Sequence, residues 1–194
     1  MTGNASQVRA LREQGADINA VGRMAFTPLL WAVLTDNESA VRILLDNGAD
    51  PNKHVHVPNG TEAASPALWT AAATGKTRIL EMILQSGGDA NQVVNGDSLL
   101  YIAVLEGKGE TAEVLLRHGA DINFPFPKLG PNVFDAAIMR RNYELAIWVL
   151  DHGYSGEVAL ARKFILKDDR LFNLQGRYKA ALLEKIDQRL GAGK

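Results

Sequence analysis

The phrase LLRHGADIN at Leu115–Asn123 occurs in closely similar form three more times in the chain. The other copies are LREQGADIN at 11–19, LLDNGADPN at 44–52 and ILQSGGDAN at 83–91, and VLDHGY ends a fifth, partial copy. The closing glycines, Gly15, Gly48, Gly87, Gly119 and Gly153, are 33, 39, 32 and 34 residues apart. An alanine lies 16 residues before each of the last four, at Ala32, Ala71, Ala103 and Ala137. Because two markers keep one interval four times, the chain is built from a repeated unit.

The sequence of each unit predicts two short helices joined by a loop. The pairs Thr27-Pro28 and Ser65-Pro66 are typical of a helix start, with an N-cap oxygen followed by proline in the first turn, and Asp97 or Ser98 takes that place in the third unit. The expected loops between the helices lie near Asp36, Gly75, Gly107 and Arg141. Apolar residues at helical spacing predict the second helix, and the closing glycine predicts a left-handed turn after it.

These features together resemble the ankyrin repeat. Its period of about 33 residues and its T-P-L-H-x-A signature are matched here by the phrase above and by TPLLWA at Thr27–Ala32. The resemblance covers roughly residues 3 to 154 and implies an all-α solenoid of stacked helix-turn-helix units with β-turn finger loops. The signature histidine is replaced by Leu30, Trp69, Tyr101 and Asp135, so the hydrogen bonds that it usually supplies must come from elsewhere or be missing.

The predicted organisation is an array at residues 1–154 followed by a C-terminal helical cap at 155–194. The array divides into a half-repeat at 1–20 and repeats at about 21–52, 53–91, 92–123 and 124–154. The half-repeat is either a cap or the trimmed edge of a longer protein. After Gly153 the chain reads as two helices with charged faces, which favour a cap that shields the last repeat. A separate partner-binding helix is the alternative.

Composition and motifs exclude several classes of function. The formal net charge of the 194 residues is -1, so no overall basic field would attract nucleic acid. No apolar run approaches the about 20 residues that span a bilayer, and no signal peptide is visible. No catalytic or nucleotide-binding motif is present, so we expect neither enzyme activity nor a cofactor. We expect a cytoplasmic location by default, or a periplasmic one if an export segment was trimmed.

His54 and His56 are candidate metal ligands, because the two rings of an H-x-H stretch lie on one side of an extended chain. The site would need a third ligand such as Glu62, and no third ligand lies at a recognisable spacing. We therefore predict no bound metal. His118 and His152 precede closing glycines, where a cation suits the end of a helix, and are expected to be structural.

The resemblance implies a concave surface made from the finger loops and the ends of the first helices. The finger candidates are Arg23, Met24, Phe26, His54, His56, Val94, Asn95, Phe124, Phe126 and Lys128. The helix-end candidates, two and three residues after each marker alanine, are Leu34, Thr35, Ala73, Thr74, Leu105, Glu106, Met139 and Arg140. Insertions at Lys53–Ser65 and Asn123–Asn132 fall on the same finger edge. Trp31 and Trp69 are expected in the core.

We therefore expect a monomeric, non-catalytic module that binds another protein. Small stand-alone ankyrin proteins of bacteria include inhibitors that neutralise a toxin or effector, so an inhibitor or immunity protein is one expectation by analogy. The alternatives are an adaptor or scaffold segment of a larger ankyrin protein and a metal-binding protein that uses His54 and His56.

Overall fold

The computed structural model describes residues 5–22, 25–54, 66–124, 132–167 and 174–191. Its helices are α1 (Ala5–Glu13), α2 (Pro28–Leu34), α3 (Glu38–Asp46), α4 (Ala67–Thr74), α5 (Thr77–Gln85), α6 (Leu99–Leu105), α7 (Gly109–Arg117), α8 (Val133–Met139), α9 (Tyr143–Asp151), α10 (Ala159–Lys167) and α11 (Leu174–Gly191). The strands β1 (Val93–Val94) and β2 (Asp97–Ser98) form a small antiparallel hairpin.

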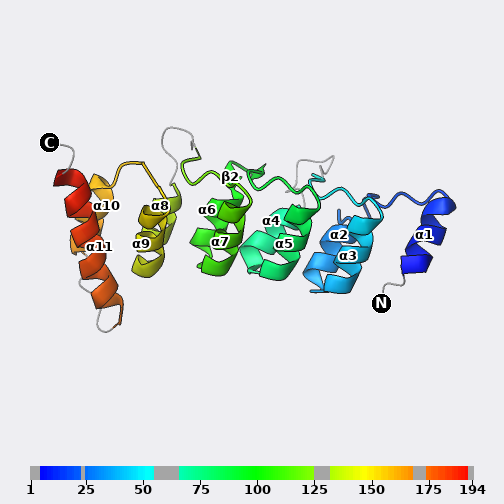
Figure 1. The fold of residues 1–194 in the computed structure, drawn as a ribbon, viewed down its shortest axis with the longest axis horizontal. Helices are drawn as coiled ribbons and strands as arrows, with labels where there is room; N and C mark the ends of the chain where they lie inside the picture. The colour runs from blue at the N-terminus through cyan, green and yellow to red at the C-terminus, as the bar shows by residue number, and fades with distance from the viewer. Residues whose placement is uncertain (1–4, 23–24, 55–65, 125–131, 168–173, 192–194) are drawn as a thin grey trace.

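The helices stack in two layers. An inner layer, in which each helix packs on the next, contains α2, α4, α6 and α8, and α10 follows against α8. An outer layer begins with α1 on α3, continues through α5 and α7, and ends with α11 on α9. The loops that join successive pairs run along one edge of the row (Figure 1). The all-α solenoid of stacked helix-turn-helix units is confirmed.

Helix starts follow local capping chemistry. The Thr27 hydroxyl accepts a hydrogen bond from the backbone N–H of Leu30, and Pro28 opens α2 as predicted. In the third unit the cap is Ser98 rather than Asp97, because the Ser98 hydroxyl accepts from the N–H of Tyr101. The second unit differs from the prediction: Pro66 is the N-cap of α4, and the helix begins one residue later.

The predicted turns lie where they were expected. The five closing glycines have positive φ angles, for example 93° at Gly87. The loop between the paired helices also turns left-handed, at Asp36 and Arg141 as well as at Gly75 and Gly107. A non-glycine residue tolerates this conformation less readily. The backbone angles thus explain why glycine recurs at the end of the second helix.

The aspartate and asparagine of the repeated phrase explain why the phrase is repeated. Each Asp accepts a hydrogen bond from the N–H two residues later and thereby forms a tight Asx turn, as Asp89 does with Asn91 at 2.9 Å. Each Asn then links its unit to the next. Its Oδ1 accepts from the N–H of Asp50 (Asn19, 2.7 Å), Asp89 (Asn52, 2.8 Å), Asp121 (Asn91, 2.7 Å) or Ser155 (Asn123, 2.7 Å). The phrase is therefore a linker between neighbours.

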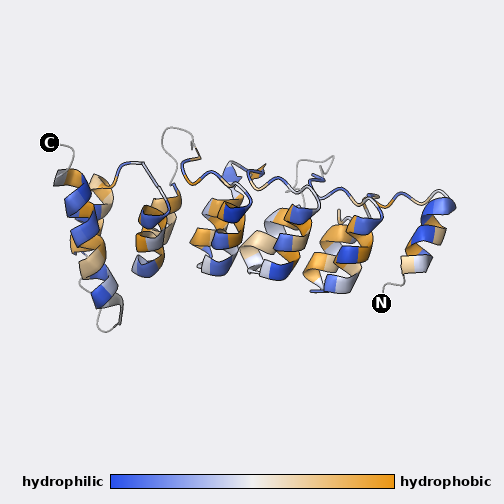
Figure 2. Ribbon diagram, in the orientation of Figure 1, coloured by the Kyte–Doolittle hydropathy of each residue, from blue (hydrophilic) through white to orange (hydrophobic). Residues whose placement is uncertain are grey.

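The core runs the length of the stack, between the two layers. The marker alanines Ala32, Ala71, Ala103 and Ala137 are all buried, as expected where helices approach closely. Apolar residues concentrate on the faces where helices meet, while hydrophilic residues dominate the connecting loops (Figure 2). Because no helix pair encloses a core alone, stability comes from the contacts between units.

The C-terminal helices carry buried apolar, charged and exposed apolar side chains. On α11, Leu182 and Ile186 are fully buried, and Lys185 is bonded to Asp151 of α9 at 2.6 Å. On α10, however, Leu160 and Phe164 are exposed. The charged residues of α10 therefore share its surface with large apolar side chains. None of the helices in the described ranges is long and apolar enough to cross a membrane.

Candidate protein-binding surface

The helix-end candidates are unequal in exposure. Leu34 on α2 is 43% exposed and Met139 on α8 is 59% exposed, so both large apolar side chains are accessible for contact. Leu105 and Ala73, in contrast, are half-buried and pack against the core. The apolar contact points that the surface offers are therefore Leu34 and Met139, near opposite ends of the inner layer.

Polar side chains at the ends of the inner helices form hydrogen bonds and an ion pair. The Thr35 hydroxyl donates to the Trp31 carbonyl at 2.9 Å, and the Thr74 hydroxyl donates to the Thr70 carbonyl at 2.7 Å. Arg140 and Glu106 form an ion pair at 2.9 Å that joins the ends of α8 and α6. The side chains of Arg140 and Glu106 are 52% and 39% exposed, so the pair adds little stability. It places one positive and one negative charge beside Met139.

Of the finger candidates, Val94 and Asn95 lie in the β1–β2 hairpin. Asn95 and Gly96 form its turn with positive φ angles, as the Asn-Gly pair favours. Asn95 and His54 are exposed, whereas Phe26, Val94 and Phe124 are half-buried. Arg23, Met24, His56, Phe126 and Lys128 lie outside the described residues.

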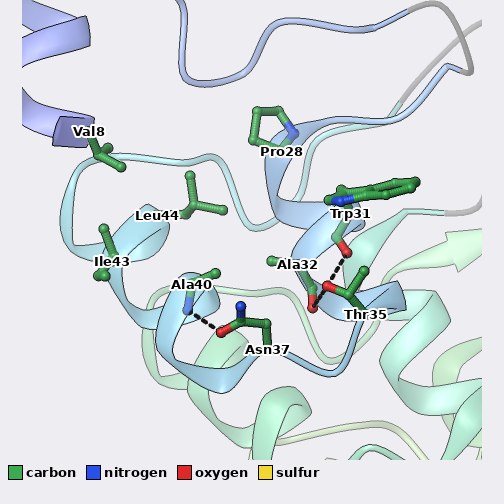
Figure 3. A pocket seen from close by; sticks show the side chains of 9 residues that line it. All are labelled: Val8, Pro28, Trp31, Ala32, Thr35, Asn37, Ala40, Ile43 and Leu44. Atoms are coloured by element: carbon green, nitrogen blue, oxygen red, sulfur yellow. Dashed lines mark hydrogen bonds between the residues drawn. The ribbon is translucent and has the colours of Figure 1, made fainter. Parts of the chain in front are cut away.

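Trp31 is not a core residue, contrary to the sequence-based expectation. Its side chain is 50% exposed, and its ring lies 6.0 Å from that of Phe26. It lines a hollow of about 400 Å³ between α1, α2 and α3, in which Val8 faces Ile43 and Leu44 (Figure 3). Within the described part of the chain, no inner helix precedes α2, and this explains the exposure. Trp69 of the second unit is half-buried and packs on the core as predicted.

Two half-buried acids, Asp97 and Asp135, lie near the starts of α6 and α8 in the second half of the array. Asp135 stands where the family signature has histidine, and it forms a capping box with Asn132. Burial raises the pKa of Asp135 and of Asp97. Burial, together with the charges of these two carboxylates, also raises the pKa of the Tyr101 hydroxyl. The Trp69 indole N–H, at the corresponding place in the second unit, has no hydrogen-bond partner among the described residues.

Nothing in the described ranges gathers three histidine, aspartate or glutamate side chains around a point that could hold a metal. His54 is described, but His56 and Glu62, the other two candidate ligands, lie outside the described residues. With Trp31 added to Leu34 and Met139, the inner layer presents three exposed apolar side chains among hydrogen-bonded polar groups.

Comparison with known proteins agrees with this architecture. A model of three ankyrin repeats matches residues 68–159, and a single-repeat model matches residues 26–54. The chain is 32% identical over 124 residues to mitochondrial disaggregase of Bos taurus and 32% identical over 151 residues to ankyrin repeat and SOCS box protein 14 of Mus musculus. It is 38% identical over 102 residues to protein PhlB of Serratia liquefaciens.

The alignments cover 61%, 73% and 52% of this chain, respectively. They cover only 17%, 24% and 42% of the three relatives, so the chain spans less than half the length of each. The residues that the family models match, 26–54 and 68–159, contain the repeated units, turns and inter-unit links described above. The chain belongs to the ankyrin-repeat family.

Proposed function

We propose that the chain binds one partner protein through the concave surface, as a monomer and without catalysing a reaction. Ankyrin repeats are protein–protein interaction modules, and this chain carries such a module. The observation that carries the proposal is the exposure of Leu34 and Met139 on the inner layer, at positions where an unoccupied surface favours charge. The Arg140–Glu106 pair beside Met139 supplies a polar rim.

The finer proposal is that the chain is a specific inhibitor, such as an immunity protein of a bacterial toxin or effector. A binding module without a catalytic motif affects its partner by covering a surface of it. The second candidate is an adaptor. It is favoured by the greater length of the relatives, among which the ankyrin repeat and SOCS box proteins name a further element beside their repeats.

The test is affinity capture from a lysate of the source organism with three forms of the chain. Wild type is compared with a Leu34→Glu/Met139→Glu variant and with an Arg78→Glu control on the outer helix α5. All three side chains are exposed, so the substitutions should leave the fold intact, and thermal melts check this. We expect wild type and control to capture the same partner and the double variant to lose it.

The outcome also separates the two finer proposals. A single enzyme or toxin, held one-to-one and inactivated, supports the inhibitor. Several partners held weakly and left active support the adaptor. Equal capture by the folded double variant would contradict the concave-surface proposal itself.

A further inference from the structure

The helix α10 exposes a face that its packing within the chain leaves uncovered. Leu160 is 71% exposed and Phe164 is 49% exposed, whereas Ala161 and Ile165 on the other side are buried. Lys163 and Lys167 are exposed as well. The spacings of three and four residues place Leu160, Lys163, Phe164 and Lys167 on one side of the helix. We call these four residues the α10 face.

Among the described residues, no side chain neutralises the charge of the α10 face. The helix contains three basic residues and no acidic one. Arg162 forms an ion pair with Asp187 of α11, but no bond or ion pair joins Lys163 or Lys167 to another residue of the described ranges. The imbalance extends further: residues 155–194 carry nine basic and five acidic side chains, whereas residues 1–154 carry 12 basic and 17 acidic ones.

The position of α10 indicates what kind of element would cover this face. Along the inner layer, α2 packs on α4, α4 on α6 and α6 on α8, and α10 then packs against α8 and α11. In the described structure the inner layer ends there (Figure 1). A further helix is the element that this mode of packing accommodates. Because two apolar side chains alternate with two lysines, such a helix should carry apolar residues and carboxylates together.

We propose that the α10 face docks an acidic amphipathic helix of a partner protein. Leu160 and Phe164 pack against the apolar side of that helix, and Lys163 and Lys167 pair with its carboxylates. This surface is separate from the concave positions Leu34 and Met139. It therefore goes beyond the function proposed above and can fail or succeed independently of it.

The test uses the whole chain and a synthetic probe. The probe is a fluorescein-labelled amphipathic helix of about 20 residues, long enough to be helical in isolation, with leucine on one face and glutamate on the other. A matched probe replaces every glutamate with lysine. Fluorescence anisotropy measures binding at low and at physiological ionic strength. We expect saturable binding of the acidic probe, weakened by salt, and no binding of the basic probe.

Variants assign the binding to particular side chains. Leu160→Ser/Phe164→Ser and Lys163→Glu/Lys167→Glu should each raise the Kd by about tenfold or more, because each removes one of the two complementary features. Two controls should leave the Kd unchanged: Arg177→Glu on α11, which alters charge in the same helical pair, and the Leu34→Glu/Met139→Glu concave variant. Because the substituted residues of the α10 face are exposed, circular dichroism should show unchanged folding.

Three results would overturn the proposal. One is equal loss of binding in the Arg177→Glu control, which would mean a diffuse charge effect. A second is no binding of the acidic probe but α10-dependent binding to phosphatidylcholine vesicles containing phosphatidylglycerol, which would assign the face to a membrane surface. The third is a dimer in sedimentation equilibrium that the α10 variants dissociate, which would assign it to a second copy.

Discussion

The helices α1 and α11 occupy corresponding places at opposite ends of the outer layer, yet they are held very differently. The helix α1 packs on α3 and has no buried residue, and its Leu11 is 54% exposed. The helix α11 packs on α9 and buries Leu182 and Ile186 completely. Its Arg189 also donates to the carbonyls of Tyr154 and Gly156 and thereby fastens the loop before α10.

This difference shows what determines local stability in a stacked fold. Each unit depends on its neighbours, so an end helix is only as stable as the interface it forms with them. The C-terminal end adds apolar burial and charge-assisted bonds to that interface. At the N-terminal end, Arg12 bonds the Asn47 carbonyl, but the hollow beside Val8 leaves apolar side chains of α1 and α2 partly in water. We therefore expect the stack to fray from α1.

The largest expected effect comes from truncating one apolar side chain in each of the two end helices, α11 and α1. Ile186→Ala removes fully buried atoms from α11 and should lower the free energy of unfolding by roughly 2–5 kcal/mol. Leu11→Ala on the exposed surface of α1 should change it by about 0.5 kcal/mol or less. Urea denaturation followed by circular dichroism measures both. Similar losses in the two variants would show that α1 is as well packed as α11.

A smaller effect concerns the asparagine links between units. In the interior, Asn91 accepts from the N–H of Asp121 at 2.7 Å and donates to the Gly119 carbonyl at 2.9 Å. Asn91→Ala removes both hydrogen bonds and should lower the free energy of unfolding by about 1–2 kcal/mol. Asn19 at the N-terminal end accepts a hydrogen bond from the N–H of Asp50. Asn19→Ala should therefore lower the free energy of unfolding by about 1 kcal/mol or less. An equal cost at both positions would contradict fraying from α1.

The smallest effect is a pH dependence in the second half of the array. Burial raises the pKa of Asp97 in the folded chain, so its charged form opposes folding at neutral pH. Asp97→Asn should therefore raise the melting temperature slightly at neutral pH. The gain in melting temperature should shrink as the pH falls through the pKa of Asp97 in the folded chain. It should vanish below the ordinary pKa of an aspartate, where Asp97 is neutral in the folded and in the unfolded chain. Asp50→Asn, in the first repeat, is the matched control, and a gain that grows in acid would contradict the interpretation.

Much of the fold could be predicted because each marker has a local physical reason. Gly87 recurs because a left-handed turn follows the helix, and Ala103 recurs because two helices meet there. Asn91 recurs because it bonds the next unit. These requirements depend on a residue and its immediate neighbours, so a repeated sequence carries them directly. The first residue of α4 was misplaced by one because a proline can serve as N-cap as well as first helical residue.

The candidate surface was less predictable, because exposure depends on what lies beside a residue in space. Trp31, the residue before the marker alanine of its unit, corresponds to the buried Thr70 of the second unit, yet it is exposed since no described inner helix precedes α2. Leu105 repeats the pattern of Leu34 but packs on the core. Similarly, the charged residues of α10 were visible in the sequence, whereas the exposure of Leu160 and Phe164 follows from how the helix packs against α8 and α11.

The central claim is that a partner protein binds the concave surface, and hydrogen exchange of the complex tests it most directly. Amide exchange of the chain would be measured alone and with the captured partner at saturation. The account predicts slower exchange at the C-terminal ends of α2 and α8 and in the hairpin at residues 93–98, with α3, α5 and α7 unchanged. Protection confined to those outer helices, with the inner layer unaffected, would contradict it.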